Sequence, residues 1–403
     1  MKALLLAALL ALPGLAQSKA QSFVLPNGLR VVHLEDHERP LVRVLLQVRL
    51  EPTDTPPGLG GLPLLWLRAS DHSDAAEFKA EAFDRLLAGA GIQLDRTLRA
   101  GGVEWRLVAR SRDQDRALGL LADRVLRTVF DPAAVEAQRV ACWREEEGLD
   151  APPGPRLRRA LEPFPGPRPT LASLGAITLD DLLAFQARVV RPDRAVLVLH
   201  GDLGLEQAKR LVFLSLGPWT AAAPSPRQGA RLPAAPTTEG PVRLPAAGTG
   251  LRLQAVVQAP AEGAPEAKAL LSLLVPADPA LAPLRVASEA GDLVITLEAQ
   301  DAPAAWRLFH DRLEALRQRG YGQADLERAR TAWRARQSLE ALHPQAQLTR
   351  ALAEVLAQGV RSERLASLSL EALNADLRRW LDPARLRLGA TGSPEALKTL
   401  PTP

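Results

Sequence analysis

The chain has 403 residues, of which 47% are hydrophobic and 24% charged. This composition excludes a disordered or fibrous protein. The chain is long enough for two or three domains with full cores. The formal net charge is only +4 and no basic block alternates with aromatic residues, so nucleic-acid binding is not indicated. Cys142 is the only cysteine, which excludes an internal disulfide.

The first twenty residues have the features of a signal peptide. Lys2 precedes an apolar stretch, residues 3–12, and the small residues Ala16 and Ala20 follow a Pro-Gly break. This order predicts export to the periplasm or beyond, with cleavage after Ala16 or Ala20. The stretch is too short to span a bilayer, and no later apolar run is long enough to do so.

Residues 21–219 show the alternation and turn residues of an antiparallel sheet, interrupted by amphipathic helices. Asn27-Gly28 and Gly101-Gly102 mark hairpin turns, and Pro132 suits the first turn of a helix. The predicted strands are residues 22–25, 29–34, 42–50, 92–98, 103–109 and 195–200. The predicted helices are residues 59–68, 75–87, 113–129, 131–147 and 179–189.

Residues 220–241 are rich in Ala, Pro, Thr and Gly without periodicity, which predicts a linker. A second domain, residues 242–400, follows. It is shorter at its front than the first domain, so a strand or helix has been lost there. Its predicted strands are residues 251–258 and the two arms of a hairpin over 284–299, and its predicted helices are residues 266–274, 303–319, 323–342, 345–358 and 370–381.

The two halves repeat one another at a constant offset of 191 residues. One spacing shared by separate blocks indicates two copies of one domain, because solenoid repeats have much shorter periods. The fold class is therefore α+β, with two homologous domains in tandem, each an antiparallel-rich sheet packed against helices. The matched pairs are Arg139 and Arg330, Thr178 and Ser369, Leu182 and Leu373, Pro192 and Pro383, Arg194 and Arg385, and Gly201 and Gly392.

Several short motifs follow one another in a characteristic order and spacing. They are Leu25-Pro26-Asn27-Gly28-Leu29-Arg30, Gly58-Leu59, Asp131-Pro132-Ala133-Ala134-Val135, Arg191-Pro192, His200-Gly201-Asp202 and Gly217-Pro218-Trp219. In these motifs the chain resembles the pitrilysin/insulinase-type zinc peptidases. The resemblance covers nearly all of the chain after the signal and implies the clamshell fold of that family.

The zinc-binding signature of the resembled family is missing. That signature, His-x-x-Glu-His, holds zinc through two His on one helix face, and its Glu activates the metal-bound water. In this chain Gly61, Leu64 and Leu65 stand at the three positions. None of these residues binds zinc or moves a proton, so the resemblance implies a member without metal or other cofactor.

One carboxylate remains at a ligand position of the resembled family. Glu145 follows the Arg139…Arg144 frame that carries the third ligand, while Gln138 replaces an acidic residue found earlier on that helix. A single carboxylate cannot hold zinc, which takes three protein ligands even in catalytic sites. A solvated charge on the helix face is the alternative interpretation of Glu145.

No other arrangement replaces the missing site. The histidines, His33, His37, His72, His200, His310 and His343, lack ligand spacing. In the second domain, where the family supplies an Arg and a Tyr to substrate, Arg285 is the only Arg of the segment 281–299. Tyr321, the only tyrosine, is expected at a helix junction, so that substrate site is not carried over.

Three functions remain open. The favoured one is an exported, non-catalytic partner subunit of a heterodimeric peptide-degrading enzyme, paired with a catalytic zinc-peptidase homologue and gripping extended peptides by strand addition. The second is a stand-alone periplasmic peptide-binding or scaffold protein of the same fold. The third, a hydrolase that uses other residues, is disfavoured by the aliphatic side chains at the motif.

Overall fold

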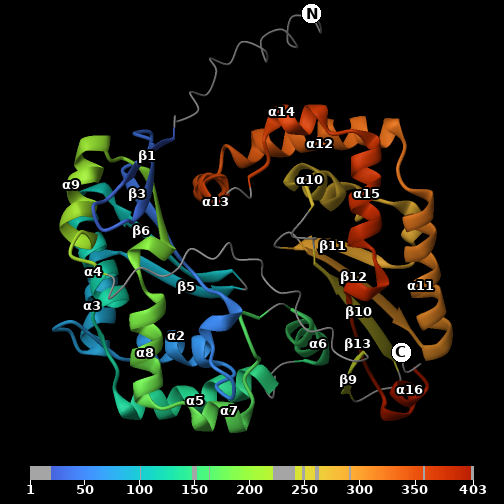
Figure 1. Ribbon diagram of the computed structural model, residues 1–403, viewed down its shortest axis with the longest axis horizontal. Helices are drawn as coiled ribbons and strands as arrows, with labels where there is room; N and C mark the ends of the chain where they lie inside the picture. The colour runs from blue at the N-terminus through green and yellow to red at the C-terminus, as the bar shows by residue number, and fades with distance from the viewer. Residues whose placement is uncertain are drawn as a thin grey trace, which may run out of the picture.

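The computed structural model describes residues 20–99, 101–147, 152–162, 164–220, 241–246, 250–258, 263–289, 292–356 and 359–400. They form two lobes, one from each half of the chain, and each lobe is a sheet covered by helices (Figure 1). The predicted α+β fold of two tandem domains is thereby confirmed. The expected signal peptide and most of the expected linker lie outside the described residues.

The first lobe contains a six-stranded sheet of order β1-β2-β8-β3-β6-β5. All of its neighbours are antiparallel except β2 and β8, which run parallel. The long alternating strand β3 buries Val42, Val44, Leu46 and Val48 against the helices, and presents Leu45 on the opposite face. The strands are β1 (Gln21–Val24), β2 (Arg30–Glu35), β3 (Leu41–Arg49), β5 (Gln93–Arg99), β6 (Gly102–Arg110) and β8 (Ala195–Gly201).

The helices of this half cover one face of the sheet, except α6 (Pro153–Leu161), which packs on the second lobe. Most predicted elements of this half are present, but three of its helices, α6, α7 and α9, were not predicted. A two-stranded ribbon, β4 (Asp74–Ala75) with β7 (Thr128–Val129), occupies the ends of two predicted helices. The helices are α2 (Leu62–Asp71), α3 (Ala80–Ala90), α4 (Gln114–Leu126), α5 (Pro132–Glu147), α6 (Pro153–Leu161), α7 (Leu171–Ala176), α8 (Leu179–Val189) and α9 (Leu205–Leu216).

The second lobe repeats this plan with a five-stranded sheet of order β11-β12-β10-β13-β9. β9 runs parallel to β13, as β2 does to β8. Its strands are β9 (Val242–Pro245), β10 (Leu251–Val257), β11 (Arg285–Glu289), β12 (Asp292–Ala299) and β13 (Leu386–Gly392). Its helices are α10 (Pro265–Leu274), α11 (Ala302–Arg319), α12 (Gln323–Glu340), α13 (Pro344–Val355), α14 (Ser362–Ser367), α15 (Leu370–Trp380) and α16 (Pro394–Lys398).

The offset of 191 residues holds in three dimensions from α5 onward. α7, α8 and β8 correspond residue for residue to α14, α15 and β13, and Thr178 and Ser369 cap equivalent helices. The shortened front of the second copy is explained between α10 and β11, where the described chain has one 3-10 turn (Pro279–Leu281) in place of α3. The lobes therefore share one topology with a simplified second copy.

Two equivalent helices connect the lobes, because each packs on the sheet of the opposite lobe. α6, from the first half, packs on β9, β10 and β13 of the second lobe, and α13 packs on β3 and β8 of the first (Figure 1). Leu157 and Leu161 of α6 contact Val256, whereas Leu348 and Leu352 of α13 belong to a buried cluster on the open face of the first sheet. Burying one leucine contributes roughly 1.5–3 kcal/mol, so each contact is a substantial part of the junction.

Candidate functional site: the position of the expected metal centre

The three motif positions lie at the start of α2, but the first precedes the helix. α2 begins at Leu62 rather than residue 59 because Gly58 and Gly61 have φ angles of 84° and 86°, in the left-handed region. Gly61 is the N-cap residue. A side chain at residue 61 would therefore not lie on the same helical face as the side chain of residue 65, as two zinc-binding His must.

The chain itself fills the space over Gly61. The Gly61 amide donates to the carbonyl oxygen of Pro167 at 3.1 Å, and Ser173 donates to the Gly60 carbonyl at 2.8 Å. A Cβ on Gly61 would lie 2.4 Å from the Pro169 Cβ, closer than real carbon contacts. A side chain at this position would thus require the segment before α7 to move.

The other two motif positions belong to the hydrophobic core. Leu65 is fully buried, and Leu64 is half-buried against the same core. The adjacent Trp66 packs edge-on to Trp105 at 6.1 Å and against Phe185 at 5.5 Å. Burying a charged or metal-binding group here without partners would be costly, so apolar packing has taken the place of the site.

Glu145 is held by arginines rather than left in solvent. α5 packs on α2, and Arg68, one turn beyond Leu64, donates to the Glu145 carboxylate. Arg159 of α6 lies 3.5 Å from the other carboxylate oxygen. Because all three side chains are more than a third exposed, the cluster contributes little to stability. It does place positive charge where a ligand carboxylate would face a metal ion.

The next carboxylate, Glu146, pairs with Arg168, which also donates to the carbonyl oxygens of Arg159 and Glu162. This arginine connects α5, α6 and the segment that covers Gly61. Gln138 is half-buried on α5. The ligand face of α5 has thus become part of an arginine-bridged helix contact.

The histidines occupy separate environments. Buried His33 has Nε2 2.7 Å from the Leu203 carbonyl, and burial lowers the pKa of this ring. Exposed His37 lies between Asp202 and Glu35, at 2.7 and 2.8 Å, and these hydrogen bonds raise the pKa of His37. Within the described part of the chain, no three His, Cys, Asp or Glu are arranged to hold a metal ion.

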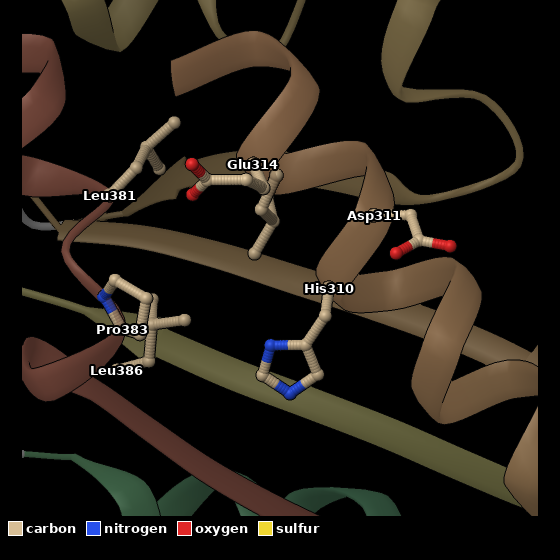
Figure 2. A pocket seen from close by; sticks show the side chains of 7 residues that line it. His310, Asp311, Glu314, Leu381, Pro383 and Leu386 are labelled. Carbon is tan, nitrogen blue, oxygen red and sulfur yellow. The ribbon is translucent and has the colours of Figure 1, made fainter. Parts of the chain in front are cut away.

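His310 lines a cavity of about 310 Å³ in the second lobe (Figure 2). Its ring contacts Trp306 with centroids 4.7 Å apart, and burial lowers its pKa. No cysteine or hydroxyl-bearing side chain lines the cavity, and it lies on the lobe that does not carry Glu145. The lining residues are His310, Asp311, Leu313, Glu314, Leu381, Pro383 and Leu386.

Arg285 and Tyr321 occupy different environments in the second lobe. Arg285 is exposed on the edge strand β11, while Val294 and Ile295 are buried in β12. Tyr321 lies at the junction of α11 and α12, as predicted, and its main chain exchanges hydrogen bonds with the Asn374 side chain. Burial raises the pKa of the tyrosine, which keeps its hydroxyl neutral.

Two of the short motifs on which the resemblance rests meet in space. The Asn27 side chain donates to the carbonyl oxygens of Leu216 and Trp219 at 2.7 and 3.0 Å. Trp219 in turn donates to the Val190 carbonyl. The first hairpin is therefore tied to the end of its own domain.

Residues 176–275 match a family model described as the Peptidase M16 inactive domain. No curated protein sequence matches. Among solved structures, the chain is similar to a putative M16-like peptidase from Alicyclobacillus acidocaldarius, with a TM-score of 0.75, 17% identity, and coverage of 93% of this chain and 98% of the other.

Two further structures show the same fold. A protease from Helicobacter pylori has a TM-score of 0.74 at 15% identity, covering 93% of this chain and 99% of the other. The periplasmic protease PqqL from Escherichia coli has a TM-score of 0.72 at 14% identity, and the match covers 95% of this chain but 47% of that one. This chain thus spans about half the length of PqqL. The family-model match over residues 176–275 and the shared fold support a non-catalytic homologue of the pitrilysin-type (M16) peptidases, in keeping with the replaced ligand positions.

Proposed function

We propose that this protein is the non-catalytic subunit of an exported, two-chain peptide-degrading enzyme. The observation that carries the proposal is the two-lobe fold combined with a covered glycine and two core leucines at the three motif positions. A peptidase fold without its metal ligands fits a subunit that binds peptide or a partner chain but does not carry catalytic residues.

The comparison with PqqL gives a model for the proposed assembly. The match covers 95% of this chain but 47% of PqqL, so the two-lobe fold makes up about half of that protein. In the proposed enzyme a homologue that carries His-x-x-Glu-His would supply the metal centre.

The free edge of the first sheet offers a means of holding peptides. Within the described residues β5 pairs with β6 alone, so its other edge has main-chain donors and acceptors available. An extended peptide can add there with little sequence demand. Asp95, Arg96 and Arg99 place charges along the strand, which disfavours uncontrolled pairing between copies.

Export is part of the proposal. Residues 1–20 have the order of a signal peptide, and the similar Escherichia coli protease is described as periplasmic. Among the described helices, none is both long and apolar enough to cross a membrane. The intact mass of the mature chain from its native source should correspond to cleavage after Ala16 or Ala20.

The decisive experiment mixes this chain with a homologue from the same source that contains the zinc motif. We expect a stable complex and faster cleavage of unfolded peptides than by the homologue alone, while this chain alone cleaves nothing. A homologue with the motif Glu replaced by Gln is the matched control, because it should assemble but not cleave. Failure of the two chains to associate at micromolar concentration would overturn the proposal.

A stand-alone peptide-binding or scaffold protein is the second candidate, and the free β5 edge fits it equally. The two candidates differ in what they require. A stand-alone protein should bind extended peptides tightly as a monomer, and its gene should have no catalytic homologue beside it.

A further inference from the structure

His200 is buried where α13 of the second lobe covers the first sheet. It lies on β8, on the same face as Val196 and Val198, which pack against Leu348 of α13. Its side chain is 0% exposed, and neither ring nitrogen has a hydrogen bond of good geometry among the described residues. A buried polar group without partners is uncommon and calls for an explanation.

The surroundings of His200 oppose a charge on its ring. Burial is the main cause that lowers its pKa, and the cations Arg43 and Arg39 act in the same direction. Asp36, whose Oδ2 lies 3.6 Å from Nε2, acts against them. Gln347 of α13 also faces the ring and acts to raise its pKa, but burial outweighs it. The docked arrangement therefore favours the neutral imidazole.

The equivalent joint of the other lobe lacks this group. At the offset of 191 residues, His200 corresponds to Thr391, which is also buried with an unpartnered hydroxyl. The cross-strand neighbour is an arginine in both sheets, Arg43 opposite His200 and Arg252 opposite Thr391. The two docking sites are thus alike in position and differ in one titratable side chain.

We propose that His200 makes the α13 joint sensitive to pH, so that its protonation weakens the docking of α13 on the first lobe while the α6 joint is unaffected. When α13 separates, the ring gains access to water and its pKa returns toward the ordinary value of about 6.5. The docked state then binds fewer protons than the separated state. Docking of α13 is accordingly strongest above pH ~6.5 and weakens as the pH falls below it. The docking equilibrium constant can fall by up to about tenfold for each unit by which the His200 pKa differs between the docked and separated states.

Hydrogen–deuterium exchange of the full chain tests the proposal, with α6 as the internal control. After correction for intrinsic exchange, amides of α13 should exchange several-fold faster at about pH 5 than at about pH 7.5, and those of α6 should not. His200→Thr, which copies the second lobe, should remove the difference. His310→Gln, which changes a half-buried histidine of α11, should leave the difference intact.

A second variant separates this effect from general damage. Asp36→Asn removes the one carboxylate that favours the protonated ring, so the acid sensitivity of α13 should increase. Equal protection of α13 at both pH values in the unmodified protein overturns the proposal, as does an unchanged response in His200→Thr. If His200→Thr does not fold, an Asp36→Asn variant without increased sensitivity overturns it.

Discussion

Arg139 and Arg330 lie 191 residues apart and make the same interactions in the two lobes. Each forms an ion pair with the glutamate three residues before it, Glu136 or Glu327, and each donates to carbonyl oxygens at the end of a short helix. These acceptors are also equivalent: Leu174 in α7 and Ile177 just after it correspond to Leu365 in α14 and Leu368 just after it. The repeat is therefore preserved in the hydrogen bonds that close each helix, not only in the topology.

Replacing Arg330 by methionine should lower the free energy of unfolding by about 1.5–3 kcal/mol, because the carbonyl oxygens of Leu365, Ala366 and Leu368 lose a charged donor. Methionine retains the apolar stem of the side chain. Urea titration followed by circular dichroism measures the change. Arg328→Met on the same helix, where the side chain is 76% exposed, should change the stability by less than about 0.5 kcal/mol. Equal effects of the two variants would show that the carbonyl contacts are unimportant.

Truncation of the exchanged leucines should loosen one joint at a time. Leu157 and Leu348 are equivalent and both fully buried, so each change to alanine should cost about 2–5 kcal/mol. Limited proteolysis should then cut near α6 in Leu157→Ala and near α13 in Leu348→Ala. Leu171→Ala, where the side chain is 61% exposed, should retain the parent cleavage pattern. Cleavage at the same sites in both leucine variants would contradict independent joints.

Gly61→Ala should destabilise the protein by more than 1 kcal/mol, about the cost of a left-handed backbone for alanine, because its Cβ also meets Pro169. Gly119→Ala is the matched control. Gly119 lies inside α4 with nothing within 4 Å of the added carbon, so this change should stabilise by about 0.5–1 kcal/mol. The melting temperatures of both variants measure these changes. An unchanged melting temperature in Gly61→Ala would refute the steric argument.

Restoring the three motif residues should not restore a zinc site. The combination Gly61→His, Leu64→Glu and Leu65→His places a ring against Pro169 and polar groups in the core, next to a Glu145 already paired with Arg68. We expect an unstable protein that binds less than one equivalent of zinc by metal analysis after dialysis. One tightly bound zinc per chain would show that the segment over residue 61, which contains Pro169, moves at little energetic cost.

Cys142 should be unreactive in the folded protein. Its side chain is buried, and this burial raises the pKa of the thiol to about 12, so the thiolate is scarce even at pH 9. A thiol-reactive dye should label the chain only after urea is added. Rapid labelling of the native protein would mean that α5 opens readily at its contact with α2.

The sequence by itself determined the repeat, the type of most elements and the loss of the zinc motif. These follow from local patterns: alternation in β3, matched pairs of the repeat such as Thr178 and Ser369, and residue identities at Gly61, Leu64 and Leu65. Local geometry is encoded within a few residues, so periodicity and turn residues are sufficient to predict it. The same locality explains the error at α2, where two positive-φ glycines delayed the start of the helix.

Only the tertiary structure decided what each apolar or charged face contacts. Periodicity marks Leu157 and Leu348 as buried, but does not reveal that each is buried by the opposite lobe. Nor does the sequence reveal that Glu145 is paired with Arg68, 77 residues away, or that His200 lies beneath α13. Neither burial nor ion pairing requires residues that are near in sequence. The contacts of each side chain are therefore fixed only when distant segments pack together.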